Sequence, residues 1–220
     1  MSVHRVATLD RQVLFLSFDF ALSKSFGSII GSYRIGRAGD HLVAGSKVIP
    51  SELSIVVEGA GNNLRTCRTY GLLSNTLSYG GLTVTIVRLL SEEEPSFVYE
   101  PIAMSTGLIL QLVSAHSAGS AGRKLEVFSR SLPSHDQRQP MDEAGKRLQS
   151  YEKAKYWGYG IGALGIAIAV LGKDDDAMVK TGVIATILGW VVASPAAVNN
   201  LKSAAAKIDE VGDRLMYWKE

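Results

Sequence analysis

Two long uncharged stretches near the C-terminus constrain the fold of this 220-residue chain more than any other feature. Residues 156–172 read YWGYGIGALGIAIAVLG, and residues 181–201 follow after the polar connector KDDDAMVK. Neither stretch shows a polar face at helical spacing, which a surface helix of a soluble protein normally keeps. The first would make a helix of about 25 Å, close to the roughly 30 Å hydrocarbon core of a bilayer. We therefore predict a transmembrane helical hairpin with spans at 156–172 and 181–198, rather than two helices buried in a small soluble domain.

The residues beside the first span suit a membrane interface. Lys155 and Lys173 bracket it and can extend their ammonium groups into water, while Tyr156, Trp157 and Tyr159 suit the headgroup level. Basic residues are more numerous outside the hairpin than in its connector. By the positive-inside rule, both termini are expected on the cytoplasmic side of a bacterial inner membrane or the matrix side of a mitochondrial inner membrane.

Small residues recur along one face of the first span. They lie at steps of three and four residues, at Gly158, Gly162, Gly165, Ala169 and Gly172. Such a face allows close helix contact in lipid, because backbones can approach and gain van der Waals packing. The contact could join the two spans of one hairpin, or it could join this chain to another copy or to other subunits. The expected partners are therefore the lipid bilayer and either further subunits of a membrane complex or the chain itself.

Residues 1–133 show short period-two alternations that are typical of β-strands. Apolar residues alternate with others from Leu14 to Leu22, and similar runs lie at 53–58, 82–90, 97–99, 108–113 and 125–129. Glycine-rich or polar segments, expected as turns, separate them at 36–41, 58–63, 79–81, 91–96 and 117–124. The run 104–114 could equally be a helix. We predict a small antiparallel β-sandwich or barrel-like domain over residues 1–133.

Two further segments complete the predicted organisation, which is that of an α+β membrane protein. Residues 134–155 are expected to form a linker and an amphipathic helix that leads into the first span. Residues 199–220 are expected to form an amphipathic C-terminal helix, with apolar residues at helical spacing: Leu201, Ala205, Ile208, Val211, Leu215 and Trp218. The mixed charges of this helix favour a protein contact over lipid binding.

Residues that carry chemistry are few. The single cysteine, Cys67, rules out an intramolecular disulfide framework and a cysteine-based zinc site. No metal-ligand spacing relates the four histidines, His4, His41, His116 and His135. Gly59-x-Gly61 lacks the third glycine and the following helix of a dinucleotide-binding turn, so we interpret it as a turn between strands. With a net charge of +2 and no pattern of interleaved aromatic and basic residues, the sequence predicts no nucleic-acid partner and no cofactor.

These observations favour a non-catalytic structural or assembly subunit of a multi-protein membrane complex. In this hypothesis the β domain docks on partner proteins and the Gly/Ala-rich hairpin anchors the chain, so no enzyme activity is expected. The alternative is an oligomeric pore-forming effector, whose hairpins assemble under the control of the β domain.

Overall fold

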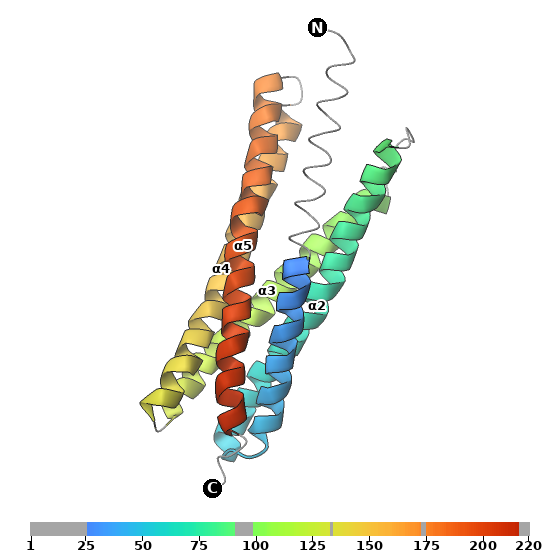
Figure 1. The fold of residues 1–220 in the computed structure, drawn as a ribbon. Coiled ribbons are helices and arrows are strands. Elements are labelled where there is room, and N and C mark those ends of the chain that lie inside the picture. Colours follow the sequence, from blue (N-terminus) through green and yellow to red (C-terminus); the bar gives the residue numbers. More distant parts are fainter. Residues whose placement is uncertain (1–25, 91–98, 133, 173–174, 216–220) are drawn as a thin grey trace.

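The computed structural model describes residues 26–90, 99–132, 134–172 and 175–215, and these residues form long helices joined by short connections (Figure 1). The first helix is described over residues 26–46. It is followed by α2 (Ser51–Leu90), α3 (Tyr99–Ser131), α4 (His135–Leu171) and α5 (Asp176–Leu215).

Local sequence signals explain where some of these helices begin and end. The Pro50 carbonyl accepts hydrogen bonds from the backbone N–H groups of Leu53 and Ser54 at the start of α2. Asp175 caps α5, because its Oδ1 accepts the N–H of Ala177 at 2.8 Å. At the other end of the α4–α5 connection, the N–H of Gly172 closes α4 on the Ile168 carbonyl.

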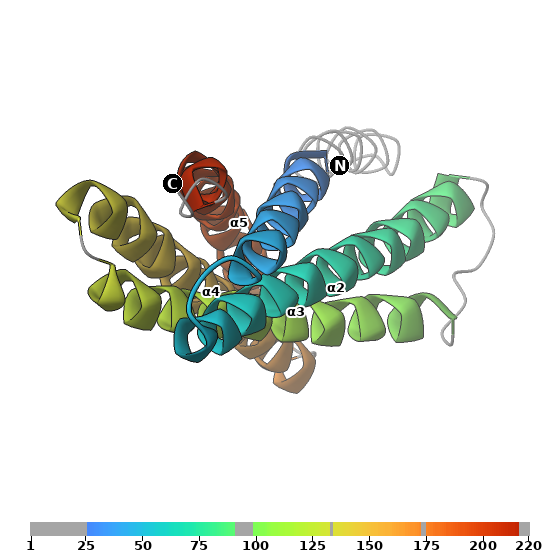
Figure 2. The same cartoon turned by 90° about the horizontal axis from the view of Figure 1, so that it is seen from below.

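The helices pack in a closed ring around one hydrophobic core (Figure 2). Along the chain, α2 packs on α3, α3 on α4, and α4 on α5. The first helix closes the ring, since Gly39 lies against Gly61 of α2 and Gly31 lies against Leu201 of α5.

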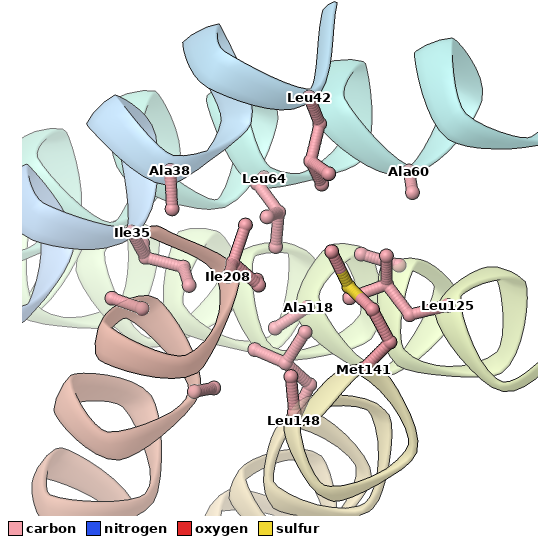
Figure 3. Close-up of a cluster of buried hydrophobic side chains, with 14 of the residues drawn as sticks. Ile35, Ala38, Leu42, Ala60, Leu64, Ala118, Leu125, Met141, Leu148 and Ile208 are labelled. Atoms are coloured by element: carbon pink, nitrogen blue, oxygen red, sulfur yellow. The ribbon is translucent and has the colours of Figure 1, made fainter. Parts of the chain in front are cut away.

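A short sequence pattern places one leucine or isoleucine from each helix in this core. The pattern Ala-Gly-x-x-Leu occurs at 38–42, 60–64, 121–125 and 144–148, and α5 carries the related Ala-Ala-x-x-Ile at 204–208. The last residue of each copy is fully buried: Leu42, Leu64, Leu125, Leu148 and Ile208 (Figure 3). The repeated pattern is therefore the core-forming unit of the bundle.

The glycines of this pattern lie where neighbouring helices cross. A Cβ atom placed on Gly61 would lie 2.7 Å from the carbonyl oxygen of Gly39, and one on Gly145 would lie 2.7 Å from that of Gly122. Real Cβ atoms do not approach a carbonyl oxygen so closely, so only glycine fits these crossings without separating the helices. The first helix and α2 thus cross in the same way as α3 and α4.

Further details repeat between these two helical hairpins. Gly36 lies against the Arg68 side chain, and Gly119 lies in the equivalent way against Glu152. The Ser46 hydroxyl donates to the Val43 carbonyl at 2.9 Å; Ser129 donates to the Glu126 carbonyl at 2.8 Å. The first four helices are therefore two copies of one helical hairpin, to which α5 is added.

The predicted β-sandwich or barrel is wrong wherever it falls on described residues, because these residues contain helices and no strand. Helices α2 and α3 contain the runs that were expected as strands at 53–58, 82–90, 108–113 and 125–129. The same two helices contain the segments expected as turns at 58–63, 79–81 and 117–124. The turn expected at 36–41 lies in the first helix. The strand at 14–22, the turn at 91–96 and residues 97–98 lie outside the described residues. The physical reason is that the segments 36–41, 58–63 and 117–124 contain glycines at helix crossings rather than at turns. In addition, a short alternation of apolar and polar residues also fits a helix.

The predicted integral membrane hairpin is wrong as well. Among the residues that the structure describes, no helix has a stretch both long enough and apolar enough to cross a bilayer. Charge is absent from 156–172 and 181–198, but Gly, Ala, Ser and Thr interrupt the aliphatic residues and lower the mean hydropathy. These stretches are parts of the longer helices α4 and α5, which pack on each other. The inner-membrane location and the orientation of the termini therefore have no support. The structure does not test the pore-forming alternative.

Candidate functional site

The most unusual buried side chain is Lys155 on α4, which is only 7% exposed. Its ammonium nitrogen lies 3.5 Å from the Tyr159 hydroxyl, and 5.9 and 5.6 Å from the ring centres of Tyr151 and Tyr159. None of the ion pairs within the described part of the chain involves Lys155. Glu152, one turn earlier, is bound by Arg123 at 2.8 Å and by His116 at 3.2 Å.

Burial controls the protonation of this cluster. It lowers the pKa of Lys155 from 10.5 to about 8, because an ammonium group loses hydration in the bundle interior; interaction with Cys67 opposes this in part. Burial also raises the pKa of the Cys67 thiol from 9.0 to about 11, although a hydrogen bond with Ser114 opposes it. The Cys67 thiol is therefore protonated at neutral pH and is a poor nucleophile, while a fraction of Lys155 is the free amine.

Two open surface hollows lie on the described part of the chain, and neither is lined by this cluster. One, of about 530 Å³, lies at the connection between α3 and α4 and is lined by Ser129, Arg130, His135, Arg138, Gln139 and Asp142. The other, of about 550 Å³, is lined by Asp40, Arg65, Arg68, Thr69, Leu72, Leu73 and Thr76. Lys155 is therefore a buried charge of the bundle interior rather than the floor of either hollow.

A second group of buried polar side chains joins the first helix, α2 and α3. Asn75 accepts a hydrogen bond from the Gln111 amide at 2.9 Å and donates to the Ser28 hydroxyl at 3.1 Å. The hydroxyl of Ser74, the residue before Asn75, donates to the Gly107 carbonyl at 2.6 Å. Buried groups with fixed partners specify how helices align, because any sliding would leave them unsatisfied. This network sets the register of α2 against α3.

A further exposed feature is a group of large apolar side chains where α4 ends and α5 begins. We call residues 156–185, which include the end of α4 and the start of α5, the α4–α5 arm. In Figure 1 its helices diverge from α2 and α3 towards the upper end of the molecule. Its exposed large apolar side chains are Tyr156, Trp157, Ile161, Leu164, Leu171, Met178 and Ile184. Trp157 is 74% exposed, Leu164 65% and Leu171 83%.

The predicted small-residue face lies on the opposite side of α4 from these side chains. A Cβ atom on Gly189 of α5 would lie 2.6 Å from the Gly158 carbonyl oxygen and 2.8 Å from the Gly162 nitrogen. Gly165 and Gly172 are also buried, whereas nothing is described for the Ala169 side chain. The small residues thus meet α5 of the same chain, and the large apolar residues of α4 point outward.

The residues predicted to lie at a membrane interface have different surroundings from one another. Lys155 is buried in the bundle, Tyr159 is half-buried beside it, and Tyr156 and Trp157 are exposed. Lys173 lies outside the described residues. Of the dinucleotide-like pair, Gly61 is at a helix crossing and Gly59 lies against Lys124.

Two sequence signals for this architecture were missed. The first is the Ala-Gly-x-x-Leu repeat, which a search for internal repeats would have detected. The second is that residues 69–87 and 101–122 also lack Asp, Glu, Lys and Arg. The α2–α3 end therefore resembles the α4–α5 arm in composition, and it too exposes apolar side chains, at Leu73, Val84, Ile102, Ile109 and Val113.

Comparison of the chain with known protein families, with characterised proteins and with solved structures found no match. Any functional argument must therefore start from the surface and interior just described.

Proposed function

We propose that this protein is a non-catalytic structural or assembly subunit that binds partner proteins through the α4–α5 arm. The observation that carries this proposal is the exposed apolar surface of that arm, whose α4 part is free of charge. Between Lys155 and Lys173 no residue carries a charge, yet Trp157, Leu164 and Leu171 are mostly exposed.

The size of this surface supports a docking role. From typical side-chain areas, the seven exposed apolar side chains of the arm present on the order of 500 Å². Contiguous apolar patches of this size on monomers are often functional, and a standard protein interface takes about 800 Å² from each partner. Large aromatic and aliphatic side chains are also the residues that contribute most to binding energy when a partner excludes water from them.

The opposite end of the bundle, where α2 begins and α3 ends, has a different surface, and this difference supports the same assignment. We call this end the lower part of the bundle. There the exposed apolar residues, such as Ile55 and Val127, occur singly, and charged side chains lie around them, for example Glu52, Glu58 and Arg130. Isolated residues of this kind are normal on any protein surface.

The test is the size of the assembly that contains this chain in the cells that make it. The proposal predicts a native complex larger than the 23.6 kDa monomer with fixed stoichiometry, measured by native mass spectrometry after gentle purification. Leu164→Glu should release the chain from this complex, because a carboxylate would be desolvated at the interface. Val127→Glu is the matched control, since Val127 is 54% exposed but lies outside the arm. A complex that survives Leu164→Glu unchanged would refute the proposal.

A further inference from the structure

The outward side of α4 carries a pattern that is absent from an ordinary helix surface. Large and small side chains alternate at heptad spacing, in the order Trp157, Gly160, Leu164, Ala167 and Leu171. All five residues are exposed, and we call them the outer α4 face. The spacing of three and four residues keeps them on one stripe, as the a and d positions of a coiled coil do.

Gly160 has open space around the position where a side chain would begin. A Cβ atom on Gly160 would meet nothing within 4 Å, unlike the glycines at the helix crossings of the bundle. No contact within the chain therefore requires glycine at this position. A large side chain from outside could enter the space between Trp157 and Leu164.

We propose that the outer α4 face binds a second copy of this chain, with the two α4 helices antiparallel about a two-fold axis. This inference rests on the proposed function, because it names one partner for the same surface. In an antiparallel pair, a positions face d positions. Leu164 of one copy then packs into the space at Gly160 of the other, and Trp157 packs over Ala167. Trp157 and Leu164 thus each meet a small residue, so the centre of the face is complementary to itself, as an interface with two-fold symmetry requires.

Charge and area agree with this arrangement. Leu171 reaches the level of Lys153 in the partner copy, and the exposed Lys153 can lay its aliphatic stem on the leucine while its ammonium group stays in water. The register that pairs Leu164 with Ala167 instead would place Trp157 beyond Leu171, where α4 ends, so no residue of the partner helix would face it. The apolar area of the outer α4 face comes mainly from Trp157, Leu164 and Leu171, which are the three most exposed large side chains of the arm.

The test is the mass of the purified full-length chain by sedimentation velocity over a range of concentrations. We expect a reversible dimer of twice 23.6 kDa. Gly160→Leu should raise its dissociation constant at least tenfold, because the new side chain fills the space that receives Leu164. Gly80→Leu is the matched control: Gly80 is also an exposed helical glycine with nothing within 4 Å of its Cβ position, and this variant should dimerise normally.

A cross-linking measurement fixes the register. Under oxidation, a mixture of Gly160→Cys and Leu164→Cys chains should give a disulfide-linked dimer, whereas either variant alone should not. The wild-type chain controls for Cys67, which is buried. A dimer that Gly160→Leu leaves intact would overturn the inference by placing the interface elsewhere.

A purified chain that stays monomeric at all concentrations would also overturn the inference. The native complex then separates the two proposals. If that complex contains other proteins and is lost with Leu164→Glu, the outer α4 face binds a different protein, and the proposed function stands. If no such complex exists, both proposals fail.

Discussion

Replacing Lys155 by methionine is expected to make the protein more stable at neutral pH. Lys155 is almost completely buried, and its amine has two tyrosines beside it but no acidic partner among the described ion pairs. The ammonium form is therefore maintained at the expense of folding stability. Methionine keeps most of the side-chain volume and removes the charge.

The size of the effect follows from the pKa. A fall from 10.5 to about 8 corresponds to ~3 kcal/mol at about 1.4 kcal/mol per pKa unit. Some of this gain is offset by the lost contacts with the two tyrosine rings, which are worth about 1 kcal/mol. We expect Lys155→Met to raise the free energy of unfolding by about 2 kcal/mol at pH 7.

The pH dependence gives an independent check with a defined sign. Because the folded-state pKa lies below the unfolded value, the unfolded chain binds more protons between about pH 8 and 10.5, and stability rises with pH in this window. Cys67 acts in the opposite direction above pH 9, since its folded-state pKa is raised to about 11, and burial likewise raises the pKa of Tyr151. Between pH 7 and 9 the Lys155 effect dominates, and wild-type stability should increase by about 1 kcal/mol.

Urea denaturation followed by circular dichroism, at several pH values from 7 to 9, measures both quantities. Lys155→Met should be more stable at pH 7 and should lose the increase towards pH 9. If the variant were less stable than the wild type at pH 7, or if it kept the wild-type pH profile, the reasoning would be refuted. Such a result would mean that Lys155 has a compensating partner or water when folded.

Three further predictions test the packing of the bundle. Gly61→Ala and Gly145→Ala should each lower the free energy of unfolding by about 1–3 kcal/mol, because the added methyl lies 2.7 Å from a carbonyl oxygen. Gly80→Ala should instead raise the free energy of unfolding by about 0.5–1 kcal/mol, because alanine favours a helix and nothing lies near this position. Equal effects of the three substitutions in urea denaturation would contradict the close helix crossings at Gly61 and Gly145. Leu148→Ala should cost about 2–5 kcal/mol in the same assay, and Val127→Ala, at a largely exposed site, should cost much less. Cys67 should react with a thiol reagent only as fast as the bundle opens, so rapid labelling of the native protein would be inconsistent with its burial.

The sequence predicted helices in the charge-free stretches 156–172 and 181–198, and amphipathic helices in the charged segments 134–155 and 199–220. Residues 156–171 and 181–198 are helical, and the helix expected after residue 198 is a continuation of α5 through Leu215. Its spacing was informative, because Leu201, Ala205, Ile208 and Val211 all lie in the core. What surrounds a charge-free helix could not be predicted, since lipid, a protein core and a partner protein all tolerate the same residues.

The N-terminal half was wrongly predicted because glycine was interpreted as a sign of turns. In isolation glycine destabilises a helix by about 1 kcal/mol relative to alanine. At Gly39, Gly61 and Gly122 this cost is offset by close helix packing, which depends on residues far away in the sequence. A local pattern therefore could not distinguish a turn from a crossing, although the repeated Ala-Gly-x-x-Leu could have. The surroundings of Lys155 could not be predicted from the sequence either, because Cys67 and Ser114 come close to α4 only through tertiary packing.

The position of the α4–α5 arm in the bundle explains why its apolar surface is available for binding. In the lower part of the bundle, each helix contributes a buried leucine or isoleucine to one shared core, so the apolar faces are satisfied within the chain. Towards the upper end, α4 and α5 meet through Gly158, Gly162 and Gly189, which bring the two backbones close together. Trp157, Leu164 and Leu171 of α4 are then left on the outside. A helix pair joined through its small residues can bury its large residues only against another molecule, and this is the physical basis for assigning the α4–α5 arm to assembly.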